Sequence, residues 1–297
     1  MKSGHSRRSF VRFSLISTVA TSPLGMCTTV HSNPTDVAEA RLRRRLRFSL
    51  SFHNPSNTNL GRQVFWCYLP FNSKSQMLID LRVSVPYRLH ADKLGQNILE
   101  IDFIDAHSHF QKVVMLEAFV DFSKNAEGKF DVLGSTWVQS ERFIEVDNLK
   151  IVSQARALKS TSDEKTIENI YEWVSNNIVY AGYISEDRGA LYALENKSGD
   201  CTEYAYLVVA LARANLIPSR VIGGYVTLND IAPMPTEYHN WAEVNLSGDW
   251  KVVDSQKQNL FPNLGLYTGF EIYRYPTVNT MEGAHRYRLD GTLLVKM

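Results

Sequence analysis

The sequence predicts an α+β protein in which an antiparallel β-sandwich precedes a domain built from a helix packed on an antiparallel sheet. Three observations predict this class. Between residues 41 and 145, apolar and polar side chains alternate with a period of two, as in half-buried strands. After Asn148 the apolar residues recur at helical spacing. A hairpin pattern then follows over residues 241–253.

The first domain is expected over residues 33–147. Its clearest strand has Leu46, Phe48, Leu50 and Phe52 alternating with polar residues, and a turn-forming segment at residues 53–57 ends it. Further strands are expected over residues 63–69, 78–85, 98–104, 112–122 and 137–146. Short strands at this spacing, with no helical period among them, predict an immunoglobulin-like β-sandwich domain.

The charge of the chain argues against binding to nucleic acid. The sequence has 32 Lys and Arg against 31 Asp and Glu, and residues 1–32 hold four of the basic residues and no acid, so the body is slightly acidic. A basic cluster stands at the start of the first strand, and we expect it to be a solvated strand edge that discourages pairing with other chains. The cluster consists of Arg41, Arg43, Arg44, Arg45 and Arg47.

The N-terminal residues 1–32 resemble a twin-arginine-type export signal. Arg7 and Arg8 precede Phe10 and a short, weakly apolar run that is too polar to span a bilayer. We therefore expect an exported protein, periplasmic or extracellular, with no membrane span in the mature chain. A basic arm without a targeting role is the alternative. Lipidation of Cys27 is not expected, because Met26 is a poor residue before a lipidated cysteine.

The second domain is expected over residues 148–297. A capping-box spacing at Thr161-Ser162-Asp163-Glu164 opens an amphipathic helix. The segment 201–214 is apolar nearly all round, which predicts a helix buried at the centre of the domain. A strand over residues 221–226 and a hairpin joined across Ser247-Gly248-Asp249 complete the pattern.

Three residues of this domain could carry chemistry together. Cys201 starts the buried helix, where the helix dipole favours an anion, so we expect its thiolate to form readily. His239 opens the first hairpin strand and Asp254 closes the second, so both stand at one edge of the hairpin. A carboxylate bonded to one imidazole nitrogen leaves the other nitrogen to take a proton from a thiol.

Separated blocks of sequence over residues 148–260 resemble the transglutaminase-like superfamily. The blocks are Gly189-Ala190-Leu191, Lys197-Ser198-Gly199-Asp200-Cys201, Ala210-Leu211-Ala212-Arg213-Ala214, Ile217-Pro218-Ser219-Arg220-Val221, Gly224-Tyr225, His239-Asn240-Trp241-Ala242-Glu243-Val244 and Trp250-Lys251-Val252-Val253-Asp254. The resemblance implies a papain-like core with Cys201, His239 and Asp254 as catalytic residues. Asn240, where Ala is common, and Ser255-Gln256, where Pro-Thr is frequent, depart from the family pattern.

By this resemblance, the chain is expected to be a cysteine enzyme that acts on amide bonds of peptides or proteins through a thioester acyl-enzyme, without a cofactor or metal ion. Hydrolysis is preferred because water is abundant and nothing in the sequence marks an amine site. Amine-dependent acyl transfer, or an inactive binding protein of the cell envelope, is the alternative. The Cys201 backbone N–H is a candidate oxyanion donor. Tyr180 is a second candidate, although we expect it to be packed in the core.

Other polar and aromatic residues have structural interpretations that we expect to hold. Asp105, His107 and His109 alternate, which is compatible with a transition-metal site but also with a polar turn, the interpretation we prefer. Cys67 is expected to be a core thiol, with no disulfide to Cys201. Two further expectations complete the set. Trp241 and Trp250 are expected to be core residues rather than the lining of an acyl-binding cleft. Glu243 and Arg220 are expected to be a structural pair or surface charges.

Overall fold

The structure, a computed structural model, describes residues 42–122, 135–277 and 279–297. The expected export signal, Cys27 and Arg41 lie outside these residues. Within the described part of the chain, no helix combines the length and the apolar character that crossing a membrane requires. The described residues combine antiparallel sheets with four α-helices, which confirms the predicted α+β class.

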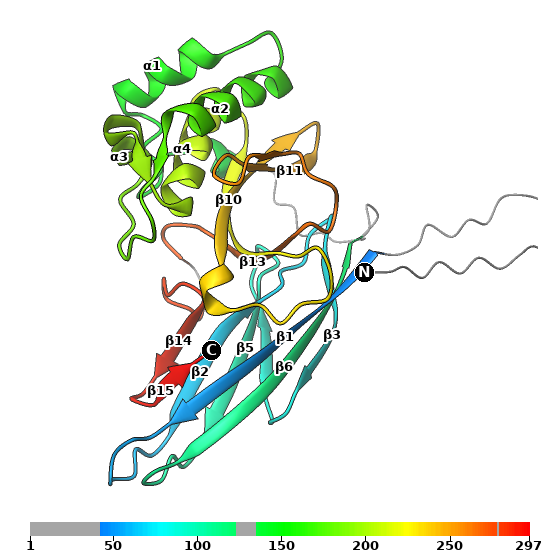
Figure 1. The fold of residues 1–297 in the computed structure, drawn as a ribbon, viewed down its shortest axis with the longest axis vertical. Helices are drawn as coiled ribbons and strands as arrows, with labels where there is room; N and C mark the ends of the chain where they lie inside the picture. The colour runs from blue at the N-terminus through cyan, green and yellow to red at the C-terminus, as the bar shows by residue number, and fades with distance from the viewer. Residues whose placement is uncertain (1–41, 123–134, 278) are drawn as a thin grey trace, which may run out of the picture. The chain divides into compact units, whose positions relative to one another are not determined.

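Two four-stranded antiparallel sheets form the two layers of a β-sandwich (Figure 1). One sheet has the order β15-β1-β6-β3 and the other the order β14-β2-β5-β4. Apolar side chains between the sheets, such as Phe52, Phe65 and Val114, form a common core, as the period-two pattern predicts. The strands are β1 (Leu42–His53), β2 (Gln63–Leu69), β3 (Met77–Val83), β4 (Arg88–Ala91), β5 (Asn97–Phe103), β6 (Gln111–Phe122), β14 (Tyr287–Asp290) and β15 (Leu294–Lys296).

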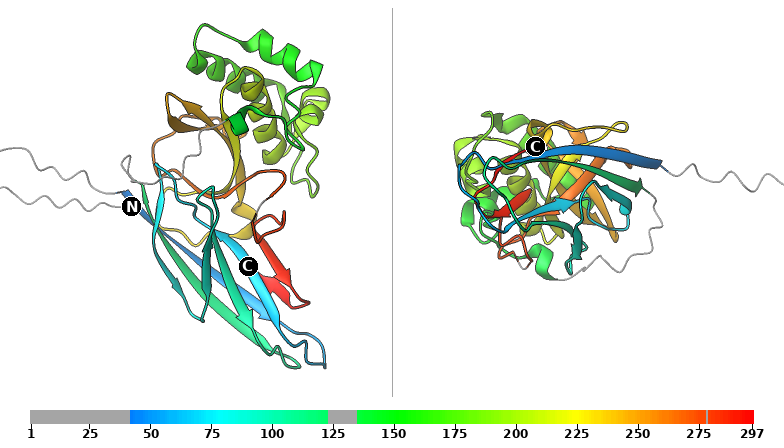
Figure 2. Two further views of the ribbon diagram at one scale, coloured as in Figure 1. Left: turned by 180° about the vertical axis from the view of Figure 1, so that it is seen from behind. Right: turned by 90° about the horizontal axis from the view of Figure 1, so that it is seen from below.

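The last two strands lie in the sandwich, although the expected domain boundary assigned residues 148–297 to the second domain. β14 pairs with β2 and β15 pairs with β1, both antiparallel. Figure 2 shows these C-terminal strands, in red, beside the blue and cyan strands of the first domain. The chain therefore returns to the sandwich formed by β1 to β6, so sequence order alone does not separate the sandwich from the rest of the fold.

The strand expected over residues 137–146 is wrong. This segment is a 3-10 helix, η1 (Ser135–Val138), followed by a tight turn in which Glu141 and Ile144 form an isolated bridge. The guanidinium of Arg213, which is fully buried, donates to the carbonyl oxygen of Gln139 and to Glu141 Oε1, both at 2.7 Å. These tertiary bonds satisfy polar groups that a strand would have paired with a neighbour.

Four helices and a five-stranded sheet form the second half of the fold. The helices are α1 (Leu149–Leu158), α2 (Asp163–Asn177), α3 (Ala190–Asn196) and α4 (Cys201–Ala214). Twelve of the 14 residues of α4 are buried, which confirms its expected central position. The α2 N-cap is Ser162, whose hydroxyl accepts from the backbone N–H of Lys165.

The five-stranded antiparallel sheet has the order β12-β11-β10-β9-β13. One face of β10 packs on α4 through Ala242 and Val244, and the other face carries Trp241, which packs with Ile222 and Phe71. A two-stranded parallel ladder lies beside α4. The strands are β7 (Val179–Tyr180), β8 (Ser198–Gly199), β9 (Ser219–Val226), β10 (His239–Leu246), β11 (Asp249–Asp254), β12 (Asn259–Leu260) and β13 (Tyr267–Ile272).

The turn between β10 and β11 has two residues rather than the expected three. Leu246 and Asp249 are paired, and Ser247 and Gly248 between them have φ values of 56° and 93°. Two consecutive positive φ values are typical of a type I′ turn, whose twist matches that of the flanking strands. The turn therefore sets the register of the whole hairpin.

Two buried glutamines of the first domain bond to the edge strand β13. The Gln76 side chain donates to the carbonyl oxygen of Gly269 at 2.7 Å and accepts from the N–H of Gly269 at 2.9 Å. Gln96 Oε1 accepts from the N–H of Ile272 at 2.6 Å. Both side chains are at least 96% buried. They supply hydrogen bonds that a further strand would otherwise provide.

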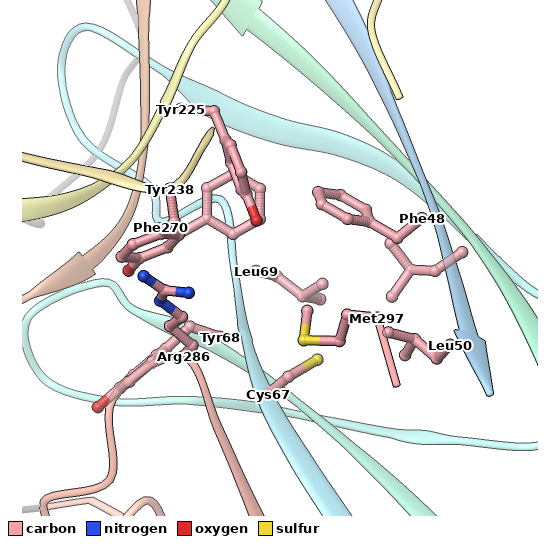
Figure 3. Close-up of a pocket in the computed structure, with 11 residues that line it drawn as sticks. Phe48, Leu50, Cys67, Tyr68, Leu69, Tyr225, Tyr238, Phe270, Arg286 and Met297 are labelled. Carbon is pink, nitrogen blue, oxygen red and sulfur yellow. The ribbon is translucent and has the colours of Figure 1, made fainter. Parts of the chain in front are cut away.

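A small apolar cavity lies where the sandwich meets the sheet (Figure 3). Its walls include Cys67 and Met297 (Figure 3). The Arg286 guanidinium covers the ring of Tyr238 at 4.3 Å. Burial raises the pKa of the Cys67 thiol to about 12, as suits the core thiol predicted on this strand.

The basic cluster on β1 is not a solvated edge along its whole length. The backbone of Arg45 and Arg47 bonds to Ile231, so a loop of the second half covers this stretch. Arg43 pairs with Asp121 at 3.1 Å and Arg45 with Asp230 at 3.6 Å. The edge groups are thus paired within the chain, which limits strand addition by a partner.

Replacing Gly224 by alanine is expected to destabilise the fold. A Cβ at this position would overlap the carbonyl oxygen of Thr268 and lie 2.9 Å from the Trp241 ring, so the neighbouring strand must move. We expect a loss of more than about 2 kcal/mol in the free energy of unfolding, measured by urea denaturation. Gly248→Ala is the control. A Cβ there would meet no atom within 4 Å, so we expect its positive φ alone to lower the free energy of unfolding, by about 1 kcal/mol. An equal loss in both variants would contradict this.

Candidate active site

The hairpin brings His239 and Asp254 into direct contact. His239 is the first residue of β10 and Asp254 the last of β11, and Ala242 faces Val253 in the register between them. The His239 Nε2 lies 2.6 Å from Asp254 Oδ2, and both residues are at least 95% buried. With Nε2–H donating to the carboxylate, the Nδ1 atom of a neutral ring carries the lone pair.

Two further donors hold the Asp254 carboxylate. The Tyr267 hydroxyl donates to the same Oδ2 atom at 2.7 Å, and the backbone N–H of Lys257 donates to Oδ1 at 3.0 Å. Asn259 Nδ2 in turn donates to the Tyr267 oxygen at 2.9 Å. Burial and the nearby Asp254 charge raise the pKa of Tyr267, so its hydroxyl stays protonated and can donate.

Cys201 stands at the first position of α4, as predicted, as a partly buried free thiol. The expectation of an easily formed thiolate is wrong. Burial, followed by the negative charge of Asp200, raises the pKa of the Cys201 thiol to about 11. Hydrogen bonds from the Asn240 backbone N–H and the Thr202 side chain lower it, without reversing the shift. The thiol is therefore neutral in the resting protein.

Asn240 links β10 to the N-terminus of α4. Its Nδ2 donates to the Thr202 hydroxyl at 2.8 Å, and its Oδ1 accepts from the Tyr273 hydroxyl at 3.2 Å. Because Asn240 follows His239 and Thr202 follows Cys201, this bond joins the two segments at the site. The residue that departs from the family pattern thus makes two side-chain hydrogen bonds that alanine could not make.

Two buried carboxylates organise the loop before the helix. Asp200 is the N-cap: it accepts from the N–H of Thr202 at 2.7 Å and from the N–H of Ile184 at 2.9 Å. Glu203 closes a capping box by accepting from the N–H of Asp200 at 3.0 Å, and its other oxygen accepts from the N–H of Arg188 at 3.0 Å. The residues between 184 and 188 are therefore held beside Cys201.

Sequence reasoning missed Glu203, although its spacing from Asp200 is that of a capping box. It also missed Tyr267 and Asn259, because the short strands that carry them have no clear pattern. Tyr180 was expected in the core, and this is wrong: its side chain is 52% exposed on β7. Tyr180 is paired with Gly199 in the β7–β8 ladder, two residues before Cys201, and burial raises the pKa of its hydroxyl.

The remaining predicted residues surround the site without joining it. Trp241 is buried and stacks on His239 with ring centroids 6.3 Å apart. Arg220 and Glu243 form a buried ion pair at 2.7 Å, and the Arg220 guanidinium lies 4.1 Å from the Trp250 ring centroid. Trp241 and Trp250 both line a groove of about 530 Å³. The tryptophans thus combine core packing with a place in a groove wall.

Asp105, His107 and His109 lie exposed in the connection between β5 and β6. They are not aligned on the face of one strand, because the strand ends at Phe103. Among the residues that the structure describes, no group of three or more His, Cys, Asp or Glu side chains could hold a metal ion.

Comparison with known proteins gives a family match for part of the chain. Residues 152–255 match the sequence model of the Transglutaminase-like superfamily. Among curated proteins, no sequence relative was found. A candidate cysteine protease from Cytophaga hutchinsonii has a similar structure, with a TM-score of 0.56 and 17% identity over 86% of this chain and 90% of that chain. The two proteins therefore share a fold.

The periplasmic domain of TgpA from Pseudomonas aeruginosa matches with a TM-score of 0.38 and 14% identity, over 71% of this chain and 89% of that chain. A candidate protease from Parabacteroides distasonis matches with a TM-score of 0.36 and 14% identity, over 76% of this chain and 47% of that chain. The sequence match therefore assigns residues 152–255 to the transglutaminase-like superfamily.

Proposed function

We propose that this protein is a cysteine enzyme that hydrolyses amide bonds of peptides or proteins, with Cys201, His239 and Asp254 as its catalytic residues. The observation that carries the proposal is the 2.6 Å bond between His239 and Asp254, at the strand end that Cys201 contacts through the backbone of Asn240. The fold shared with the candidate cysteine protease of Cytophaga hutchinsonii supports the same class of chemistry.

The first half of the reaction forms a thioester. His239 Nδ1 accepts the proton of the Cys201 thiol as the sulfur attacks the amide carbonyl carbon, which gives a tetrahedral intermediate. The imidazolium then returns this proton to the leaving nitrogen, the C–N bond breaks, and an amine departs. Asp254 holds Nε2–H throughout, which leaves Nδ1 as the ring nitrogen that accepts and returns the proton.

The second half of the reaction restores the thiol. The oxygen of a water molecule attacks the thioester carbonyl carbon while His239 takes a proton from that water. The second tetrahedral intermediate then breaks its C–S bond, and the leaving sulfur regains the proton from the imidazolium. The products are a carboxylic acid and the free thiol. Because Cys201 begins neutral, proton transfer to His239 accompanies the attack in place of a preformed thiolate.

The oxyanion that develops needs hydrogen-bond donors. The backbone N–H of Cys201, at the start of α4, is one candidate, since the first N–H groups of a helix have no partner within it. The hydroxyl of Tyr180 is a second candidate, supported by its exposure and by the pairing of Tyr180 with Gly199, two residues before Cys201. Tyr180 is thus better suited to this role than sequence reasoning suggested.

The other assignments from sequence complete the proposal. Residues 1–32 act as a twin-arginine-type export signal, so the protein works in the periplasm or outside the cell. The sandwich of strands β1 to β6 is the immunoglobulin-like domain of this proposal, with the C-terminal strands β14 and β15 added to its sheets. The exposed loop at Tyr183, beside the Cys201 helix, is available to a peptide or protein substrate.

Replacing Cys201 by serine is expected to lower the rate of amide hydrolysis by at least about 1,000-fold, because the hydroxyl is a much weaker nucleophile. Asp254→Asn should also reduce kcat strongly, because an amide does not fix the imidazole in the required orientation. A peptide library analysed by mass spectrometry measures turnover. Cys67→Ser is the matched control, and its turnover should equal that of the parent protein. Full activity in Cys201→Ser would exclude this nucleophile.

Alkylation should report the neutral state of the thiol. Free cysteine has a pKa of about 8.5, so at pH 7 we expect iodoacetamide to alkylate native Cys201 more slowly than free cysteine. The rate should rise continuously as the pH passes 9, and Cys67 should be labelled only after unfolding. Mass spectrometry of peptides follows both residues. A Cys201 rate that already reaches its plateau below pH 7 would instead indicate a preformed thiolate.

Competition between water and an amine distinguishes hydrolysis from acyl transfer. With a labelled primary amine present at millimolar concentration, we expect the free carboxylic acid to remain the main product, because water is the more abundant acceptor. Mass spectrometry of the product measures the ratio of acid to amide. Amide as the main product would replace hydrolysis by amine-dependent acyl transfer. Cys201→Ser should suppress both products.

A further inference from the structure

The Asp254 carboxylate receives two short hydrogen bonds at one oxygen atom. His239 Nε2 lies 2.6 Å and the Tyr267 hydroxyl 2.7 Å from the same Oδ2. Tyr267 and His239 come from β13 and β10, which lie on either side of β9 in the sheet. The tyrosine therefore reaches Asp254 independently of the hairpin.

The direction of the tyrosine bond follows from its second partner. Asn259 Nδ2 can only donate, and it donates to the Tyr267 oxygen at 2.9 Å. The single hydrogen of the hydroxyl is thereby left for the Asp254 carboxylate, which can only accept when ionised. Asn259, Tyr267, Asp254 and His239 thus form a chain of hydrogen bonds with one consistent polarity.

We propose that Tyr267 is a positioning residue that limits how strongly Asp254 holds a proton on His239, and so keeps the imidazole available as a neutral base. The proposal rests on the proposed function for its catalytic meaning. A hydrogen bond from Tyr267 draws part of the carboxylate charge away from the imidazole. Without it, the same buried carboxylate would stabilise the imidazolium more strongly, and the base would need a higher pH to lose its proton.

Few other charged groups face this pair. Tyr171 from α2 and Cys201 from α4 interact electrostatically with Asp254, and burial raises the pKa of both, so each is neutral near pH 7. Asp200, at the start of α4, acts on Cys201. From the turn after β11, the backbone N–H of Lys257 donates to Asp254 Oδ1. Among these groups, Tyr267 is the side chain that bonds the same Asp254 Oδ2 atom as His239. Its hydrogen bond therefore acts most directly on the interaction between Asp254 and His239.

The test compares Tyr267→Phe with Tyr225→Phe in the whole protein. Tyr225 is also a buried tyrosine of this sheet, but it lies on β9 and does not contact Asp254. The NMR titration of the His239 ring protons should move to higher pH by about one unit in Tyr267→Phe, as loss of a hydrogen bond to a charged group predicts. It should not move in Tyr225→Phe. An unchanged midpoint in folded Tyr267→Phe would overturn the proposal.

Activity gives the second readout. The acidic limb of the pH profile of kcat/KM should shift upward with the titration in Tyr267→Phe, with KM nearly unchanged, whereas a merely structural role would lower activity equally at every pH. If the NMR titration moves and no substrate is turned over by any form of the protein, the proposed function fails while the role of Tyr267 stands.

A second variant covers the case in which Tyr267→Phe does not fold. Asn259→Ala keeps the tyrosine and removes only the amide that orients its hydroxyl. We expect a smaller shift in the same direction. No shift, or a shift to lower pH, would overturn the proposal.

Discussion

The register of the β10–β11 hairpin governs everything that happens at the site. Two residues with positive φ close the turn, and each pair along the ladder follows from that closure. Because side chains alternate between the faces of a sheet, a slip by one residue would send Asp254 to the opposite face from His239. The bond between them thus depends on Ser247 and Gly248, at the far end of the hairpin from the chemistry.

Buried carboxylates fix the second part of the site, the start of α4 and the loop before it. Asp200 and Glu203 satisfy the first N–H groups of α4 and those of the preceding loop, so the loop and the helix form one unit. The same arrangement has an electrostatic consequence, because negative charge near Cys201 opposes formation of the thiolate. The N-terminus of a helix is favourable to an anion only when nothing else there is already negative.

The parts of the site that were predictable from sequence lie where local patterns are strong. The apolar run of α4 and the alternation around Gly248 were enough to place Cys201, His239 and Asp254 on the correct elements. Tyr267 was not predictable, because β13 pairs with β9 from about 45 residues earlier in the sequence. Backbone N–H groups of β13 also donate to the side chains of Gln76 and Gln96, which lie in the sandwich part of the chain. Such partners leave no trace in the local pattern.

Other failures have the same origin. Residues 137–146 have the alternation of a strand, but the buried Arg213 guanidinium donates hydrogen bonds to the Gln139 carbonyl oxygen and the Glu141 carboxylate. The thiol of Cys201 was judged from the helix dipole alone, and burial with Asp200 outweighs that dipole. In each case a tertiary contact from a distant segment overrides a valid local rule.

The return of β14 and β15 to the first domain sets an order on synthesis and folding. β1 and β2 are made early, yet their outer partners are among the last residues of the chain. Pairs so far apart in sequence close large loops, which slows folding and leaves strand edges open in the meantime. A nascent chain would therefore hold incomplete sheets until β14 and β15 have been synthesised, and a chaperone that shields open edges would be of most use in that interval.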